Sequence, residues 1–150
     1  MATTKRNLWP ESVKIDTLTP VVILRGQASE LERLTKGVLR GEVTSQATGD
    51  GFLIHQLDVI APAVGFYRHR IVEVKHPDAF VYPAQIIAPG ILLGLTFGHG
   101  EAESQEALEK FIGIVFTSKQ TISVIQSLIA RSNELTFAPP PPPEPLESAK

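Results

Sequence analysis

The order of periodic segments along the chain constrains its fold more than any single motif does. A helical pattern comes first, between residues 20 and 38, followed by β-type segments as far as residue 97 and then by two more helical patterns. Helices do not alternate with the β-type segments, as they would in a parallel sheet built from βαβ units. The order therefore predicts an α+β fold, in which an antiparallel β-meander of four or five strands is packed by one N-terminal and two C-terminal helices.

The first helix is predicted from its start signal and its apolar stripe. Thr19 and Pro20 are an N-cap residue and a proline at the first helical position. Gly37 and Gly41 offer places for the helix to end. A second interpretation stays open, in which residues 21–24 form a short buried strand and a helix starts later. The stripe, with spacings of three and four residues, consists of Val21, Leu24, Ala28, Leu31, Thr35 and Val38.

Five segments between residues 41 and 97 have the composition of strands and are separated by turn signals. The stretches between them contain Gly, Pro and Asp, which favour turns, and residues 88–90 (Ala-Pro-Gly) are one such turn. Pro83 indicates an edge position or a bulge within the fourth segment. The four predicted strands, and a fifth segment that is either extended or a buried loop, are residues 41–47, 52–60, 66–76, 80–87 and 91–97.

Two amphipathic helices are predicted from Gly98 onward. Acidic side chains between Glu101 and Glu109 form the outer face of the first helix, opposite an apolar face. Ser118 can cap the second helix, whose apolar residues recur at helical spacing. These residues are Ile122, Ile125 and Ile129, with Val124 and Leu128 beside them.

The chain has 150 residues, enough for one domain with a sizeable core. We expect residues 1–137 to form a single globular α+β domain and residues 138–150, with five consecutive prolines, to form a disordered tail. Hydrophobic residues make up 43% of the chain and charged residues 20%, as in ordinary soluble proteins. No apolar run approaches the roughly 20 residues that span a bilayer. The chain has no cysteine, which fits a reducing compartment, so we expect a cytoplasmic protein without membrane contact.

Motifs of known chemistry are absent from the sequence. It contains no Gly-x-Ser-x-Gly elbow, no Ser-x-x-Lys pair and no glycine-rich phosphate or dinucleotide loop. Without cysteine, thiolate metal sites and Cys nucleophiles are excluded. These absences favour a non-enzymatic protein without cofactor, metal or catalytic residues, while acid–base chemistry assembled in space stays open.

Tyr67, Arg68, His69 and Arg70 form the densest group of functional side chains. Such mixtures of aromatic and cationic groups occur in proteins that bind phosphates or single-stranded nucleic acid. On a strand, however, the two arginines share one face while Tyr67 and His69 share the other. The net charge of −2 also differs from the basic balance of dedicated nucleic-acid binders. We therefore expect a protein partner or self-association rather than nucleic acid.

The four histidines of the chain raise the question of a metal site. His69 and His76 are seven residues apart, so on one continuous strand they point to opposite faces. His55, on the preceding strand, could face one of them, with Asp58 or Glu73 supplying a carboxylate. No spacing matches a known zinc pattern. We expect histidines that are exposed or hydrogen-bonded within the sheet rather than metal ligands.

The preferred functional hypothesis is a small soluble, non-enzymatic interaction or accessory protein that acts through the surface of the α+β domain. Apolar residues on both faces of residues 52–60, together with the run at 86–97, favour self-association into a homo-oligomer. The proline-rich tail has a binding rationale of its own, because a polyproline II segment docks into aromatic grooves at low entropic cost.

The alternative hypothesis is a small-ligand-binding protein or enzyme. Its pocket would lie near His55, Tyr67, His69 and Tyr82. The candidate ligand-binding residues are His55, Tyr67, Arg68, His69, Arg70 and Tyr82.

Overall fold

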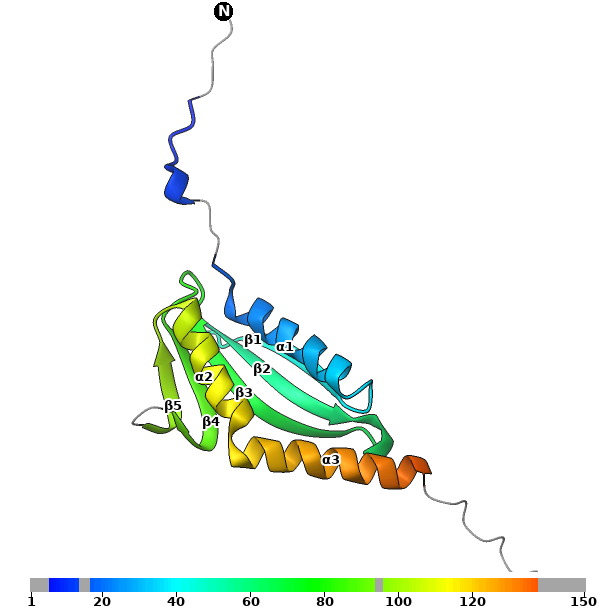
Figure 1. Ribbon diagram of the computed structural model, residues 1–150. Helices are drawn as coiled ribbons and strands as arrows, with labels where there is room; N and C mark the ends of the chain where they lie inside the picture. The colour runs from blue at the N-terminus through cyan, green and yellow to red at the C-terminus, as the bar shows by residue number, and fades with distance from the viewer. Residues whose placement is uncertain (1–5, 14–16, 94–95, 138–150) are drawn as a thin grey trace, which may run out of the picture.

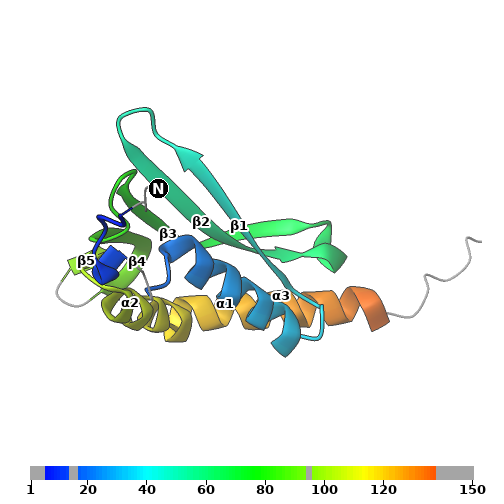
Figure 2. The same ribbon diagram turned by 90° about the horizontal axis from the view of Figure 1, so that it is seen from above.

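The computed structural model describes residues 6–13, 17–93 and 96–137, which form one five-stranded antiparallel sheet and three α-helices (Figure 1). One helix precedes the sheet and two follow it, so the predicted α+β class is confirmed. All three helices lie on the same side of the sheet (Figure 2). The predicted disordered tail, residues 138–150, lies outside the described residues.

Helix α1 spans Pro20–Leu34, which decides between the two interpretations of residues 21–24 in favour of the helix. Thr19 is the N-cap and has extended backbone, as its position before a proline requires. The helix ends just before Lys36 and Gly37, whose φ angles are 53° and 82°. Its buried residues are Pro20, Ile23, Leu24 and Ala28.

The five strands follow one another across the sheet in chain order, each antiparallel to the next. A meander of this kind brings segments that are adjacent in sequence together at every step, as the predicted turns implied. The strands are β1 (Arg40–Ala47), β2 (Phe52–Ala61), β3 (Tyr67–Pro77), β4 (Ala84–Leu93) and β5 (Thr96–Ala102).

The prediction for the fourth strand was wrong at both ends. β4 starts at Ala84, after a cis Tyr82–Pro83 peptide bond, and not at residue 80. It then continues through Pro89 and Gly90, where we predicted a turn. The Pro-Gly pair forms a wide bulge instead, because four residues of β4 (88–91) lie opposite a single residue of β5.

The helical prediction from Gly98 to Ser104 was also wrong. Residues up to Ala102 belong to β5, and α2 (Gln105–Thr117) begins later, with Ser104 as its N-cap. The Ser104 hydroxyl accepts a hydrogen bond from the Ala107 N–H at 3.2 Å. The acidic residues before residue 105 therefore belong to the sheet and its exit, although their spacing resembles the outer face of a helix.

Helix α3 (Lys119–Phe137) begins where Ser118 was predicted to cap it. The Ser118 hydroxyl accepts a hydrogen bond from the Thr121 N–H at 3.2 Å. The same residue has extended backbone, with φ −66° and ψ 149°, and separates α3 from α2. The two C-terminal helices are therefore distinct and meet at a bend.

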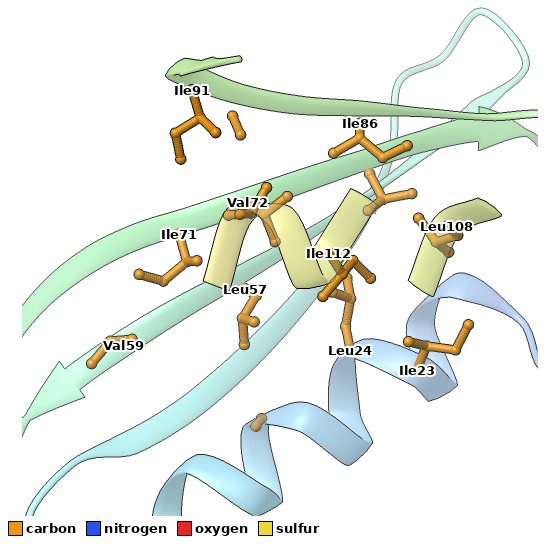
Figure 3. Close-up of a cluster of buried hydrophobic side chains, with 14 of the residues drawn as sticks. Ile23, Leu24, Leu57, Val59, Ile71, Val72, Ile86, Ile91, Leu108 and Ile112 are labelled. Carbon is orange, nitrogen blue, oxygen red and sulfur yellow. The ribbon is translucent and has the colours of Figure 1, made fainter. Parts of the chain in front are cut away.

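One hydrophobic core fills the space between the sheet and the helices (Figure 3). Leu24 of α1 and Leu108 of α2 are fully buried there against Val72 and Ile86 of the sheet. Among the described residues, no helix covers the opposite face of the sheet, which carries mainly polar side chains. Its apolar members are partly covered, as where Lys75 Nζ lies 4.6 Å from the centre of the Phe52 ring.

Candidate functional site: an opening between β3 and β4

Strand β3 is paired very unequally on its two sides. With β2 it forms ten residue pairs, from Tyr67 opposite Ala61 to Pro77 opposite Phe52. With β4 it forms three, which involve residues 73–75 of β3. Within the described residues, the first half of β3 (67–72) therefore has a strand neighbour on one side alone.

Two bulges explain why β3 and β4 separate. In β3, Arg70 lies opposite Asp58 and Val72 opposite Leu57, so Ile71 is an extra residue between them. In β4, the wide bulge at residues 88–91 begins directly after the last residue paired with β3. A bulge bends its strand and increases its twist. The last pair between the two strands is Glu73 with Ile87, and each strand has its bulge just beyond that pair. β3 and β4 therefore diverge from this point.

A hollow of about 470 Å³ occupies the space between the diverging strands and the start of α3. We call it the β3–β4 opening. Its floor is apolar, since Ile71 and Ile91 are buried and also belong to the core cluster (Figure 3). Its rim is polar. The residues that line the whole opening, floor and rim together, are His69, Arg70, Ile71, Glu73, Ile87, Pro89, Ile91, Gln120, Thr121 and Val124.

Tyr67 and His69 share one face of β3, as predicted, and the structure shows that this face is the helix side. His69 lines the β3–β4 opening and, together with Tyr67, a neighbouring hollow beside α3 of about 330 Å³. The two hollows also share Val124 of α3. Sequence reasoning had placed these two side chains on one face, and the structure adds α3 as the element they face.

Arg68 and Arg70 share the opposite face, also as predicted, and both bind the buried carboxylate of Asp58. Arg68 Nη1 lies 2.9 Å from Asp58 Oδ2, and Arg70 Nε lies 3.0 Å from Asp58 Oδ1. Burial disfavours the charged form of Asp58, but the hydrogen bonds from Arg70 and Arg68 outweigh it and hold its pKa below the ordinary value. Glu42 and Glu73 extend this network, so both guanidinium groups are already engaged with carboxylates.

His55 lies elsewhere, in a buried pair with His76. Their Nε2 atoms are 2.9 Å apart, and Nδ1 of His55 lies 2.7 Å from the Ser45 hydroxyl. On β2, His55 lies four residues from Val59, and Val59 is the residue opposite His69. His55 is therefore about 13 Å along the sheet from the position of His69. His55 and His69 therefore do not share one pocket.

The surroundings of the pair determine where its protons lie. Nδ1 of His76 faces two carbonyl oxygens, those of Pro77 at 2.8 Å and Phe80 at 3.2 Å, so it must carry a hydrogen. In the neutral pair, Nε2 of His76 is then an acceptor and Nε2 of His55 the donor. Nδ1 of His55 in turn accepts from Ser45. Burial, followed by the nearby His76 and Arg25, lowers the pKa of His55 to about 4.

The predicted opposite orientation of His69 and His76 was wrong because of the bulge at Ile71. His69 lies opposite Val59 and His76 opposite Leu53, and residues six apart on the regular strand β2 share a face. Asp58 is three residues from His55 and therefore points to the other face. Among the described residues, no group of three or more His, Asp or Glu side chains is placed to hold a metal.

Tyr82 precedes β4 and contacts the start of α1. Its hydroxyl donates to the Leu18 carbonyl at 3.0 Å, and burial raises its pKa, with a smaller effect from Glu109. Of the six candidate residues, two thus line the β3–β4 opening, one lies beside it and one joins Arg70 in binding Asp58. His55 and Tyr82 serve other contacts.

Sequence reasoning missed the contribution of α3 to the site. Thr121 interrupts the apolar pattern of this helix, is buried, and lines the opening, as does the exposed Gln120. A polar residue within an apolar stripe is a signal that could have been followed. Pro89 and Gly90 were noticed, but as a turn.

Within the described part of the chain, no single helix is long and apolar enough to cross a membrane. Helices α2 and α3 taken together have the length and composition of a membrane span, with a bend of 56° between them.

Comparisons with protein-family models, curated proteins and solved structures find no match to this chain.

Proposed function

We propose that the protein is a non-enzymatic interaction or accessory protein whose partner binds in the β3–β4 opening. The observation that carries the proposal is that, in the described part of the chain, the first half of β3 has no strand neighbour on one side, where a hollow has an apolar floor and a polar rim. Binding interfaces have this anatomy, with a desolvated apolar centre surrounded by polar groups.

The chemistry of the opening supports binding more than catalysis. Its charged residues, Arg70 and Glu73, belong to the ion-pair network around Asp58. In the buried histidine pair, His55 lies about 13 Å along β2 from the position opposite His69, and the pair is enclosed by Ser45 and backbone carbonyls. Such groups rigidify the surroundings of a binding site and leave its specificity to shape and backbone contacts.

The test is to block the opening with a large side chain and to measure whether the protein still binds its partner. Gln120 is exposed and lines the opening, so Gln120→Trp obstructs it without disturbing the core. Gln126, exposed on the same helix and outside the opening, provides the matched control Gln126→Trp. We expect a stoichiometric partner, co-purified from extract of the native host, to be retained by the wild type and by Gln126→Trp and lost by Gln120→Trp. Equal recovery by all three would contradict the proposal.

A small-ligand-binding protein or enzyme is the second candidate. Its support is the volume of the opening, about 470 Å³, which lies within the usual range of roughly 300–1,000 Å³ for ligand pockets. A thermal-shift screen of small ligands separates the two. A ligand that stabilises the wild type and Gln126→Trp but not Gln120→Trp, without any protein partner, would favour this candidate.

Self-association is a further proposal, and the free edge of β1 supports it. Residues 44–47 of this strand are exposed, and no Pro or Lys protects the edge. A second copy could pair there and extend the sheet. In sedimentation velocity, we expect Gln46→Lys to convert an oligomeric wild type into monomers. A wild-type protein that sediments as a monomer at high concentration would contradict this proposal.

A further inference from the structure

We infer that the partner enters the β3–β4 opening as an extended polypeptide segment, which pairs with residues 67–72 of β3 as an additional strand. The inference rests on the proposed function and names the class of ligand for the same site. It adds a mode of recognition, in which the main chain of β3 supplies the hydrogen bonds.

The main chain of β3 is available for such pairing. Residues 67–72 are paired with β2 from Tyr67, opposite Ala61, to Val72, opposite Leu57. An interior strand has a second neighbour that takes the N–H and C=O groups on its other side, but in the described residues the β4 ladder begins at Glu73. Strand edges with unpaired groups are templates for another strand.

The lining of the opening suits a strand because it has two different sides. Alternate side chains of an added strand would point to the helix side, where Ile71, Ile91 and Val124 form an apolar floor. The side chains between them would point to the open face, where Arg70 and Glu73 lie. The structure therefore selects a segment in which apolar and polar residues alternate.

β4 cannot take this position itself. The bulge at Pro89 and Gly90 directs it away from β3, and a proline has no N–H with which to complete a ladder. Gly90 has a φ of +81°, and a side chain there would meet the Gln120 amide at 3.0 Å. Pro89, Gly90 and Gln120 therefore shape the part of the β3–β4 opening where β4 lies beside α3.

The free edge of β1 is the competing site for strand addition. It exposes backbone in the same way, but residues 44–47 are polar or small and offer no large apolar side chain against which a segment could pack. An added strand at β1 would gain main-chain hydrogen bonds without an apolar floor. We therefore assign the segment to β3.

The experiment uses linear random-sequence peptides, selected by display against the full-length protein and then synthesised. The best binder is measured by fluorescence anisotropy against the wild type, Gln120→Trp, Val124→Trp and the controls Gln126→Trp and Gln46→Lys. Each backbone amide of the peptide is then N-methylated in turn. We expect alternating apolar residues in the peptide, and about a tenfold loss of affinity from N-methylation at every second position with little effect at the positions between.

The outcomes separate this inference from the proposed function. Loss of binding in Gln120→Trp and Val124→Trp, with the alternating N-methyl pattern, supports strand addition at β3. Loss in those variants without alternation overturns the inference and leaves the opening as the binding site. Loss in Gln46→Lys instead moves the added strand to β1 and overturns it. If no peptide is enriched, or if binding survives in both tryptophan variants, the inference is overturned, and co-purification of a folded partner decides the proposed function by itself.

Discussion

The buried histidine pair shows how closely single residues are fixed in this protein. Three hydrogen bonds in a row, from the Ser45 hydroxyl to the Pro77 carbonyl, satisfy the two imidazole rings and assign a tautomer to each. The pair joins β1, β2 and β3 on the helix side of the sheet. A neutral, fully bonded pair of this kind stabilises the fold as long as it stays neutral.

The pair predicts that stability falls on acidification. The pKa of His55 is about 4 in the folded protein, against an ordinary value of 6.5. Between these two values the unfolded chain binds a proton that the folded protein does not, so stability decreases as the pH falls through this range and levels off below it. This lowering of the pKa corresponds to about 3 kcal/mol of stability lost over that pH range.

Denaturant unfolding of the wild type and two variants across this pH range tests the prediction. His55→Gln removes the titrating group, and we expect a lower free energy of unfolding with a flatter pH dependence. His99 is exposed, so His99→Gln should keep the pH dependence of the wild type. A slope that is the same in His55→Gln as in the wild type would contradict the assignment.

Asp58 predicts a second effect at a single residue. It is 1% exposed and binds two arginines, whereas the side chain of Glu42, at the edge of the network, is 44% exposed. Asp58→Asn removes the charge and part of the hydrogen bonding, at a cost of about 2–3 kcal/mol, less than for a fully buried pair because both arginines reach solvent. Glu42→Gln should cost under about 1 kcal/mol. Equal free energies of unfolding for the two variants would be the contrary result.

At the scale of elements, α1 packs closely against β1 at Gly41. A Cβ atom at Gly41 would lie 2.6 Å from the Cα atom of Ala28 in α1. This clash is with backbone, so no side-chain movement can relieve it. Gly26, on the same helix, has open space around it. The two glycines therefore have opposite roles, although both lie in regular elements.

Alanine substitutions at these glycines test the packing of α1. We expect Gly41→Ala to destabilise the protein by about 2–3 kcal/mol, because α1 has to move away from the sheet. Gly26→Ala should stabilise it by about 0.5–1 kcal/mol, through helix propensity. Thermal or denaturant unfolding measures both changes. A tolerated Gly41→Ala would show that α1 packs on β1 less closely than this.

Element boundaries show where sequence reasoning reached its limit. Sequence reasoning predicted α1 and the first three strands to within a few residues, from the apolar stripe of α1, the composition of the strand segments and the turn residues between them. It failed where a bulge changed the register. Ile71 reversed the expected relation of His69 and His76, and Pro89 with Gly90 formed a bulge within β4 rather than a turn. A bulge inserts a residue without altering composition, so a pattern of alternation cannot reveal it.

At the scale of the whole molecule, the order of elements was enough to predict the α+β class. It could not show that all three helices cover the same face of the sheet (Figures 1 and 2). It could not show either that an ion-pair network around Asp58 lies on the other face. It could not show the β3–β4 opening either. That site depends on two bulges and on α3, which are far apart in sequence.

The opening is the central claim, and amide hydrogen exchange of the free protein tests it most directly. The account predicts that residues 73–75 of β3, paired on both sides, are uniformly protected. Within residues 67–72, amides that point to β2 should be protected, whereas those that point into the opening should exchange much faster. Uniform protection from residue 67 to residue 75 would contradict the account, because it would mean that the edge of β3 is already occupied.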